Sequence, residues 1–365
     1  MKFNCTQLAL TKALNTVTKA VSTRTTLPVL RGILLTAKEN KLYLTASDLD
    51  LSIETAIDVS VEKEGSVVVN ASLFENIIRK LPNAMIKIEL IDKKLCVSCL
   101  GSSFAILSIP ADEFPPISVV NELKKVNLDK ESFKDLVKKT SFAASVDEKK
   151  GVLTGVLLVF EEDNIEFVAL DGYRMAVACA EVESGLKNRM IVPARILNEI
   201  GKIISETDEA EDVSLIIDEK RIAVVTSNTR VIVRLLDGEF IKYRDIIPAQ
   251  YKTLAVVSRD DMLASIERAA LLVKTNNLIK MSVTNGNIEI TSNSEEGNVT
   301  ENVAAEVSGE DIVIGFNSKY IIDALKAVSD DEVSFEFTSP VSASLIRPVS
   351  GTAFTYLVLP VKIKV

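Results

Sequence analysis

Histidine and tryptophan are both absent from this chain of 365 residues. Without histidine the protein lacks the commonest general base and the commonest metal ligand, and no Ser-His or Cys-His nucleophile pair can form. Most familiar classes of hydrolytic and acyl-transfer enzymes are excluded on that ground. We therefore expect no catalytic site, no metal site and no cofactor.

Cysteine is also scarce, with four residues at positions 5, 96, 99 and 179. Cys96 and Cys99 have the spacing of a redox or zinc pair, but their flanks alternate like a β-strand. No second Cys or His pair exists to complete four zinc ligands. The sequence has no evident signal peptide, so we expect reduced, buried, structural thiols in a cytoplasmic protein.

The chain also lacks long apolar runs, since none approaches the roughly 18 residues that a membrane span requires. Its hydrophobic content of 47% and mean hydropathy of +0.23 nevertheless predict sizeable cores. We expect a soluble protein without membrane partners. The formal charge of −9 by itself argues against a polyanionic partner.

The chain contains an internal repeat with an offset of 123 residues. The segment Leu30–Leu35 aligns with Leu153–Leu158, and Ala46–Asp48 aligns with Ala169–Leu170–Asp171. A repeat this long indicates whole domains, predicted over residues 1–125, 126–248 and 249–365. Three copies leave no room for a separate catalytic domain, so function is expected from the repeats or from their arrangement.

Each copy has the pattern of two helices separated by runs of strands. Helical spacing of apolar residues predicts helices over residues 6–21, 71–81, 131–145, 193–205, 258–273 and 317–329. The segments between them alternate in period two and are rich in Val, Ile and Thr, as in Lys41–Ala46, which predicts half-buried antiparallel strands. The fold class is therefore α+β.

The expected helices are net basic although the chain as a whole is acidic. They hold thirteen Lys and Arg residues against eight Asp and Glu residues, so the strands and loops carry the acidic excess. For any single helix, the simpler interpretation of its basic residues is an ordinary solvated face. Repetition over three copies favours a shared basic helical surface, which would contact phosphates weakly and without regard to sequence.

Several motifs carry a resemblance over the whole length of the chain. They are Met1-Lys2-Phe3, Thr26-Leu27-Pro28-Val29-Leu30, Leu44-Thr45-Ala46-Ser47-Asp48-Leu49-Asp50, Phe114-Pro115, Ala169-Leu170-Asp171-Gly172-Tyr173-Arg174-Met175-Ala176-Val177 and Val358-Leu359-Pro360-Val361. In these motifs the chain resembles the bacterial DNA sliding clamp, the β subunit of DNA polymerase III.

The resemblance implies three clamp domains, each with two helices packed on antiparallel sheets. Two subunits would close head to tail into a ring whose helices line the central hole, which encircles double-stranded DNA without reading its sequence. The implied partners are the DNA polymerase III catalytic subunit, the clamp loader and other proteins with a clamp-binding motif. At the dimer interface, Phe104 would meet Leu271 and Leu272 of the partner subunit.

The resemblance also implies an apolar pocket for partner peptides between domains two and three. Its residues would be Leu153, Leu170, Gly172, Tyr173, Arg174, Ile241, Ile246, Val341, Leu357, Leu359, Pro360 and Val361. Ile241 stands where the family usually has a Phe-Pro pair, and Asp245 stands where a basic residue is common. The DNA-facing residues would be Lys12, Lys19, Arg24, Arg79, Lys80, Lys134, Lys138, Lys139, Arg195, Lys202, Arg268, Lys319 and Lys326.

Two other functions stay open at this point. A metal-dependent hydrolase would use paired carboxylates, such as Asp48 with Asp50, or Asp171 with Arg174. Asp48 and Asp171 share one repeat position, where the third copy has Ser294, so a turn role is the simpler interpretation. A protein-binding scaffold without DNA is the other alternative, and only a clamp would depend on whether the DNA has ends.

Overall fold

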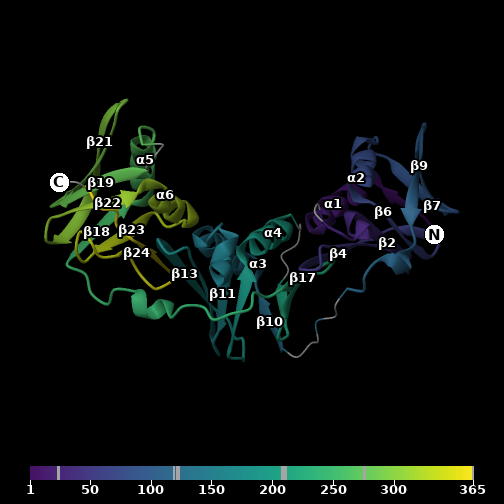
Figure 1. Cartoon of the computed structure of the whole chain (residues 1–365), viewed down its shortest axis with the longest axis horizontal. Coiled ribbons are helices and arrows are strands. Elements are labelled where there is room, and N and C mark those ends of the chain that lie inside the picture. The colour runs from purple at the N-terminus through teal and green to yellow at the C-terminus, as the bar shows by residue number, and fades with distance from the viewer. Residues whose placement is uncertain (23–24, 118–119, 121–123, 207–211, 274–276, 364–365) are drawn as a thin grey trace. The chain divides into compact units, whose positions relative to one another are not determined.

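The structure of the chain is a computed structural model that describes residues 1–22, 25–117, 120, 124–206, 212–273 and 277–363 (Figure 1). Contacts between residues group it into two compact units. Unit 1 consists of Met1–Lys130 and Lys202–Leu235, and unit 2 consists of Glu131–Gly201 and Leu236–Val365. The domain boundaries expected near residues 125 and 248 stay predictions.

All six expected helices are present, and each is shorter than the periodicity indicated. They are α1 (Gln7–Val17), α2 (Ala71–Lys80), α3 (Lys130–Thr140), α4 (Ala194–Ser205), α5 (Arg259–Ala270) and α6 (Ser318–Ala327). Short 3₁₀ turns follow α1 over Thr18–Ala20 and α3 over Ser141–Ala143. The apolar spacing continued into these turns, which explains the overlong prediction.

Side-chain caps fix where four helices begin. Thr6 accepts a hydrogen bond from the Ala9 N–H at 3.3 Å, and Asn70 accepts one from Leu73 at 2.9 Å. Ser258 and Asn317 cap α5 and α6 in the same way. Each cap satisfies an N–H group that has no partner within the helix. The placement of Pro193 inside a helix was wrong, because Pro193 ends a strand and pairs with Gly155 before α4 begins.

Unit 1 contains a 13-stranded antiparallel arrangement. In spatial order the strands are β10 (Lys124–Leu128), β15 (Val213–Ile217), β16 (Arg221–Val225), β17 (Thr229–Arg234), β4 (Leu51–Asp58), β3 (Lys41–Ser47), β2 (Gly32–Lys38), β6 (Gly65–Asn70), β9 (Ser102–Ile109), β8 (Lys94–Cys99), β7 (Met85–Ile91), β1 (Lys2–Thr6) and β5 (Ser60–Lys63).

Unit 2 contains a 12-stranded antiparallel arrangement. Its order is β14 (Asn188–Pro193), β11 (Gly155–Phe160), β12 (Asn164–Leu170), β13 (Arg174–Glu181), β25 (Phe354–Val358), β24 (Ser344–Pro348), β23 (Glu332–Phe337), β18 (Thr253–Ser258), β21 (Gly297–Gly309), β20 (Asn287–Ser294), β19 (Leu278–Thr284) and β22 (Ile312–Asn317).

Neighbouring repeat copies are joined by strand pairing. In unit 1, β17 of the second copy pairs with β4 of the first, with Val231 opposite Ile53. In unit 2, β25 of the third copy pairs with β13 of the second, with Leu357 opposite Met175. The last strand of the second copy, β17, thus pairs with β4 of the first copy. The last strand of the third copy, β25, pairs in the same way with β13, the counterpart of β4 in the second copy. We call these two junctions the seams.

The cores lie between helices and strands. In α1, Leu10, Leu14 and Val17 are fully buried, and the helix packs on β3 and β4. Burying each such side chain contributes about 1.5–3 kcal/mol relative to leaving it exposed. Along β3, Leu42 and Leu44 are buried while Tyr43 between them is only half-buried, so the period-two pattern separates a helix-covered face from an outer face.

The cysteines are all free, and Cys96 and Cys99 lie on β8 as expected. Cys5 and Cys99 are buried. Burial raises the pKa of the Cys5 thiol to about 12, so it stays protonated and unreactive at neutral pH. Among the described residues, no helix is long and apolar enough to cross a membrane.

Glycine is required where β2 and β11 begin. A Cβ on Gly155 would lie 2.5 Å from Ile191 Cγ2 and 2.8 Å from Leu236 Cδ1. The equivalent Gly32, 123 positions earlier, would meet Val68 Cγ1 at 2.5 Å. Both glycines let a neighbouring strand approach closely, which explains the shared Gly in the two aligned motifs.

We expect Gly155→Ala to destabilise the protein by about 1–3 kcal/mol, the usual cost of overpacking. Gly101→Ala is the matched control, because a Cβ there would meet no heavy atom within 4 Å. Urea unfolding of both variants measures the difference. Equal stability of the two variants would contradict the close packing at Gly155.

Candidate functional site

The carboxylates suspected of catalysis are turn residues. Asp48 Oδ1 accepts hydrogen bonds from the backbone N–H groups of Asp50 (3.1 Å) and Leu51 (2.7 Å). Asp171 Oδ1 accepts the corresponding bonds from Tyr173 (2.8 Å) and Arg174 (3.1 Å).

The third copy keeps this turn with a different side chain. The Ser294 hydroxyl accepts a hydrogen bond from the Glu296 N–H at 3.2 Å. Asp and Ser both fold the backbone this way, so the shared position has a structural role in all three copies. Within the described part of the chain, no group of three or more His, Cys, Asp or Glu side chains is placed to hold a metal ion.

The expected peptide-binding residues surround a buried apolar cluster in unit 2. The buried part of the cluster comprises Leu157, Val159, Val168, Leu170, Met175, Val177, Ile191, Tyr243, Leu345 and Leu357. Val168 belongs to it, whereas the adjacent Phe167 packs edge-on against Phe133 of α3. The cluster therefore lies on the sheet face away from α3. Of the expected residues, Leu153, Leu170 and Leu357 are part of it or pack on it.

Six other expected residues are exposed next to this cluster. They are Tyr173, Ile241, Ile246, Val341, Leu359 and Val361, and we call them the docking surface. The chain neighbours Phe240 and Ile247 pack against the cluster, so Ile241 and Ile246 lie at its border. Exposed apolar side chains over a buried apolar base are what an anchor residue of a peptide requires.

Backbone hydrogen bonds hold the C-terminal segment in this surface. The Leu359 N–H donates to the Tyr173 carbonyl at 2.9 Å, and the Val361 N–H donates to the Gly315 carbonyl at 2.8 Å. Gly172, with φ of +94°, makes the turn before Tyr173. Pro360 lies between the two tethered residues and is partly exposed. The segment from Leu359 to Val361 is thus fixed next to Tyr173.

Arg174 is engaged by its own chain rather than exposed for a partner. Its Nε donates to Asp171 at 3.1 Å, its Nη1 to Asp323 of α6 at 2.5 Å, and its Nη2 to the Phe142 carbonyl at 2.8 Å. The guanidinium also lies over the rings of Phe142 and Tyr320, and its side chain is only 10% exposed. Arg174 therefore ties the second copy to the third and positions Tyr173.

Tyr320 is a contact that the sequence analysis missed. Its ring stacks on the ring of Tyr173, with the two centroids 6.4 Å apart. The Lys150 ammonium lies 5.4 Å from the centroid of the Tyr173 ring and donates to the Asp171 carbonyl at 2.7 Å. Tyr320 is 147 positions from Tyr173 in the sequence. No local pattern indicates such a pair, because it forms only when two copies join.

Tyr243 was also missed, although it belongs to the buried cluster. Its hydroxyl donates to Glu166 Oε2, which also pairs with Arg244 at 2.9 Å. Burial and this hydrogen bond raise the pKa of Tyr243 to about 12. The Tyr-Arg pair fixes the connecting segment between copies two and three on the outer face of β12. In the sequence, the only indication of this role is that Tyr243 is an aromatic residue within an Ile-rich segment.

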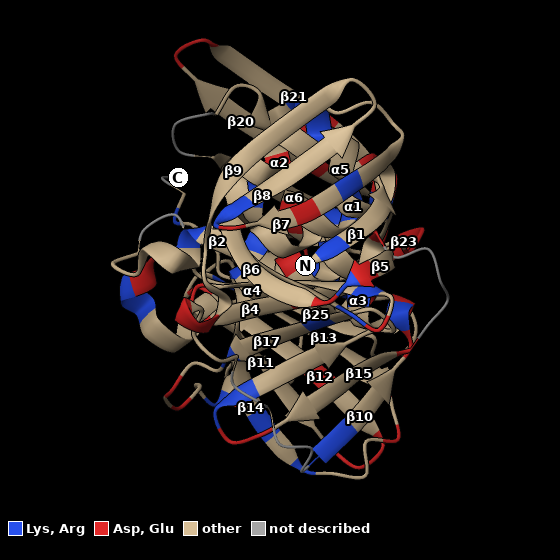
Figure 2. Ribbon diagram, turned by 90° about the vertical axis from the view of Figure 1, so that its right-hand side faces the viewer, with Lys and Arg blue, Asp and Glu red and all other residues tan. Residues whose placement is uncertain are grey.

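The expected DNA-facing residues divide into paired and unpaired groups. Ion pairs engage Lys19 with Glu206, Lys134 with Glu131, Lys139 with Asp135, Arg268 with Glu301 and Lys326 with Glu267. Arg79 donates to Asn76, and Lys12 and Lys202 are exposed on α1 and α4. Arg24 lies outside the described residues. Figure 2 shows Lys and Arg interspersed with Asp and Glu along the ribbon.

Four helical cations remain available for an anion. Lys80, Lys138, Arg195 and Lys319 are exposed and have no ion-pair partner among the described residues. Three of them lie in unit 2, on α3, α4 and α6. Unpaired cations attract phosphate more strongly than cations already neutralised by a carboxylate. Each of the four is therefore a candidate for contact with a phosphate.

The residues expected at the dimer interface lie at strand or helix edges. Phe104 on β9 is 39% exposed and its neighbour Leu107 is more exposed, while Leu271, directly after α5, is 65% exposed. Leu272 is partly exposed. Exposed apolar side chains at a strand edge are what a subunit interface requires.

Three copies of one two-helix fold, joined edge strand to edge strand, form the architecture of a DNA sliding clamp. Models of the DNA polymerase III beta subunit match the chain with their N-terminal domain over residues 1–118, their central domain over 127–242 and their C-terminal domain over 244–362. The chain belongs to this family.

Two relatives illustrate the similarity. A beta sliding clamp from Staphylococcus epidermidis is 34% identical over 363 residues, which cover 96% of this chain and 96% of that protein. The crystal structure of a DNA polymerase sliding clamp from Bacillus subtilis has a TM-score of 0.95 at 32% identity and covers 100% of both chains. The similarity extends over all three copies.

We expect Arg174→Ala to lower the melting temperature by more than about 4 °C, because it leaves Asp171 and Asp323 without their cation. Lys187→Ala is the matched control, since it removes an ion pair with Glu162 in which both side chains are exposed, a pair worth less than about 1 kcal/mol. Scanning calorimetry compares the two variants. A smaller loss for Arg174→Ala than for Lys187→Ala would contradict the tie between the copies.

Proposed function

We propose that this protein is a non-catalytic sliding clamp that encircles duplex DNA and tethers the replicative DNA polymerase and other DNA-processing proteins to it. It acts as a head-to-tail homodimer. Its attachment to DNA is topological, so it needs no sequence-specific contact. It works in the cytoplasm, where bacterial DNA is replicated.

The strand edges left over by the two seams support ring closure most directly. Among the described residues, Ser102–Leu107 of β9 pair only with β8, and Gly297–Ala304 of β21 pair only with β20. β9 is the last strand of the first copy, and β21 is the third copy's counterpart of β4 and β13. At each seam, the last strand of one copy pairs with the β4-equivalent strand of another, so β9 and β21 offer the two kinds of edge that a seam joins.

The seams also supply a register for this contact. The β8–β9 hairpin of the first copy corresponds to the β16–β17 hairpin of the second. Ile106 lies opposite Leu95 in the first hairpin, and Val233 lies opposite Ile222 in the second, so these pairs are equivalent. Phe104 is therefore the counterpart of Val231, whose seam partner is Ile53. Val299 is the counterpart of Ile53 in the third copy, because it lies two repeat offsets of 123 residues further along the chain. Phe104 then lies opposite Val299 of the partner subunit, in a contact that closes because each subunit offers one edge of each type.

The helical surface supports the contact with DNA. In unit 1, α2 carries the unpaired charge of Lys80, and in unit 2, α3, α4 and α6 carry those of Lys138, Arg195 and Lys319, so each copy has at least one exposed helical cation without an ion-pair partner among the described residues. Contacts from such side chains to phosphates are screened by salt and exchange rapidly. They let a closed ring move along the duplex, whereas tight contacts would hold it in place.

The docking surface supports partner binding. An extended peptide can place apolar side chains over the Leu170–Leu357 cluster, next to the exposed side chains of Tyr173 and Leu359. Ile241 and Asp245 differ from the usual residues of the family, so the preferred peptide sequence differs too. The surface needs no catalytic group, which agrees with the turn roles of Asp48 and Asp171.

We expect Phe104→Asp to convert the dimer to a monomer, because it places a charge in an apolar strand contact. Sedimentation velocity then gives the 39.8 kDa mass of one chain instead of twice that value. Val146→Asp is the control, since Val146 is fully exposed and belongs to neither β9 nor β21. A dimeric Phe104→Asp variant with normal circular dichroism would rule out this interface.

Leu359→Asp should weaken binding of a clamp-binding-motif peptide from a polymerase III catalytic subunit by more than about tenfold. Val349→Asp, an exposed apolar residue outside the docking surface, should leave affinity unchanged. Fluorescence anisotropy with the labelled peptide measures both. Normal affinity of Leu359→Asp would show that the docking surface is assigned wrongly.

Removing Lys138, Arg195 and Lys319 together by alanine substitution should reduce the salt dependence of duplex binding. Each lost phosphate contact lowers the slope of log affinity against log salt by about 0.9. Lys94→Ala, a strand lysine, is the control. An unchanged slope for the triple variant would place the DNA-facing surface elsewhere.

A further inference from the structure

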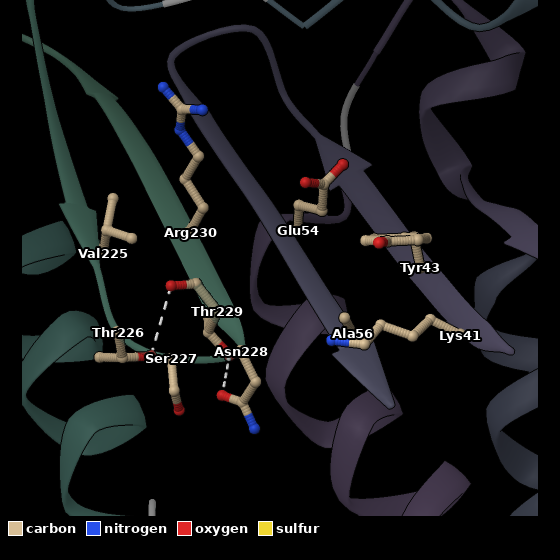
Figure 3. Close-up of a pocket in the computed structure, with 10 residues that line it drawn as sticks. All are labelled: Lys41, Tyr43, Glu54, Ala56, Val225, Thr226, Ser227, Asn228, Thr229 and Arg230. Atoms are coloured by element: carbon tan, nitrogen blue, oxygen red, sulfur yellow. Dashed lines mark hydrogen bonds between the residues drawn. The ribbon is translucent and has the colours of Figure 1, made fainter. Parts of the chain in front are cut away.

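Unit 1 contains a polar cavity of about 230 Å³ that none of the functions above uses (Figure 3). It lies at the seam between β4 and β17. Its lining includes Lys41 and Tyr43 from β3, Glu54 from β4 and Arg230 from β17. Tyr43 points away from the buried Leu42 and Leu44, so the cavity opens on the face opposite α1.

One wall of the cavity is held rigid by hydrogen bonds. The Asn228 carbonyl accepts from the Ala56 N–H at 2.9 Å and from the Thr55 hydroxyl at 3.3 Å. The Thr226 N–H donates to the Thr229 carbonyl at 2.9 Å, which closes the turn between β16 and β17. The cavity is therefore preformed and needs no rearrangement to accept a ligand.

Arg230 is incompletely satisfied in this cavity. Its Nε is buried and has no hydrogen-bond partner among the described residues. Glu54 is its direct cross-strand neighbour, yet no ion pair joins the two side chains. A buried, unpaired guanidinium N–H is costly, and a carboxylate is its best geometric complement. Arg230 thus lacks an acceptor that a ligand can supply.

Glu54 lacks a strong hydrogen-bond donor, whereas Arg230 lacks an acceptor. Its carboxylate accepts one long hydrogen bond, from the Thr45 hydroxyl at 3.4 Å, and retains capacity for a stronger donor. Figure 3 shows Glu54 and Arg230 projecting side by side, with the Tyr43 ring next to Glu54. A ligand that fits both charges has a carboxylate with an N–H donor nearby, and an apolar part can pack on Tyr43 and Ala56.

We propose that this cavity binds an α-carboxylate with its adjacent nitrogen, the group shared by a free amino acid and the C-terminal residue of a protein. The carboxylate pairs with Arg230, and the nitrogen donates to Glu54. Glu54 disfavours ligands with several negative charges, such as phosphates. The cavity is separate from the docking surface, so this proposal does not depend on the function proposed above.

Isothermal titration of the full-length protein with three probes tests the proposal. Leucine carries the free amino acid group, N-acetyl-leucine mimics a protein C-terminus, and leucinamide lacks the carboxylate. Binding of leucine alone identifies free amino acids as the source, and binding of N-acetyl-leucine identifies a C-terminus. Equal binding of leucinamide, or no binding of any probe, overturns the proposal.

Variants assign the binding to the cavity. Arg230→Gln and Glu54→Gln should each weaken the bound probe by about tenfold or more, the factor given by 1.4 kcal/mol. Arg234→Gln is the matched control, because Arg234 lies on the same strand and face but pairs with Asp50. Ala56→Leu fills the cavity without changing a charge and should also abolish binding. Unchanged affinity in Arg230→Gln or Ala56→Leu would overturn the site.

Discussion

The structure depends on strand edges that one copy cannot satisfy alone. Each copy ends in a strand whose outer edge pairs with the copy before it, as β17 does with β4 and β25 with β13. An unpaired edge exposes backbone N–H and C=O groups and promotes association. A chain of three copies leaves one edge of each type, on β9 and β21, and two such chains satisfy both by closing a ring.

Function follows from this closure rather than from reactive groups. The absence of histidine and the turn roles of Asp48, Asp171 and Ser294 leave no constellation for catalysis in the described residues. In the function we propose, the protein instead combines weak contacts from exposed helical cations with an apolar docking surface. A ring makes weak contacts sufficient, because a closed ring stays on DNA without binding it tightly.

The fold could be predicted from the sequence because its signals are local. Apolar periodicity indicated all six helices, and the offset of 123 revealed the copies. The site was predicted less completely. Arg174 bonds to Asp323 across 149 positions, and Tyr243 bonds to Glu166 across 77. The first contact forms only when copies two and three join, and the second joins distant segments of copy two, so no local pattern indicates either of them.

The central claim is that the protein stays on DNA because it encloses it. The most direct test is to load the protein onto nicked circular DNA with a clamp loader from a related bacterium, and to measure retention before and after one cut linearises the circle. We predict stable retention on the circle and rapid loss from the linear DNA at the same salt concentration. Equal retention on both forms would contradict a topological link and indicate ordinary surface binding.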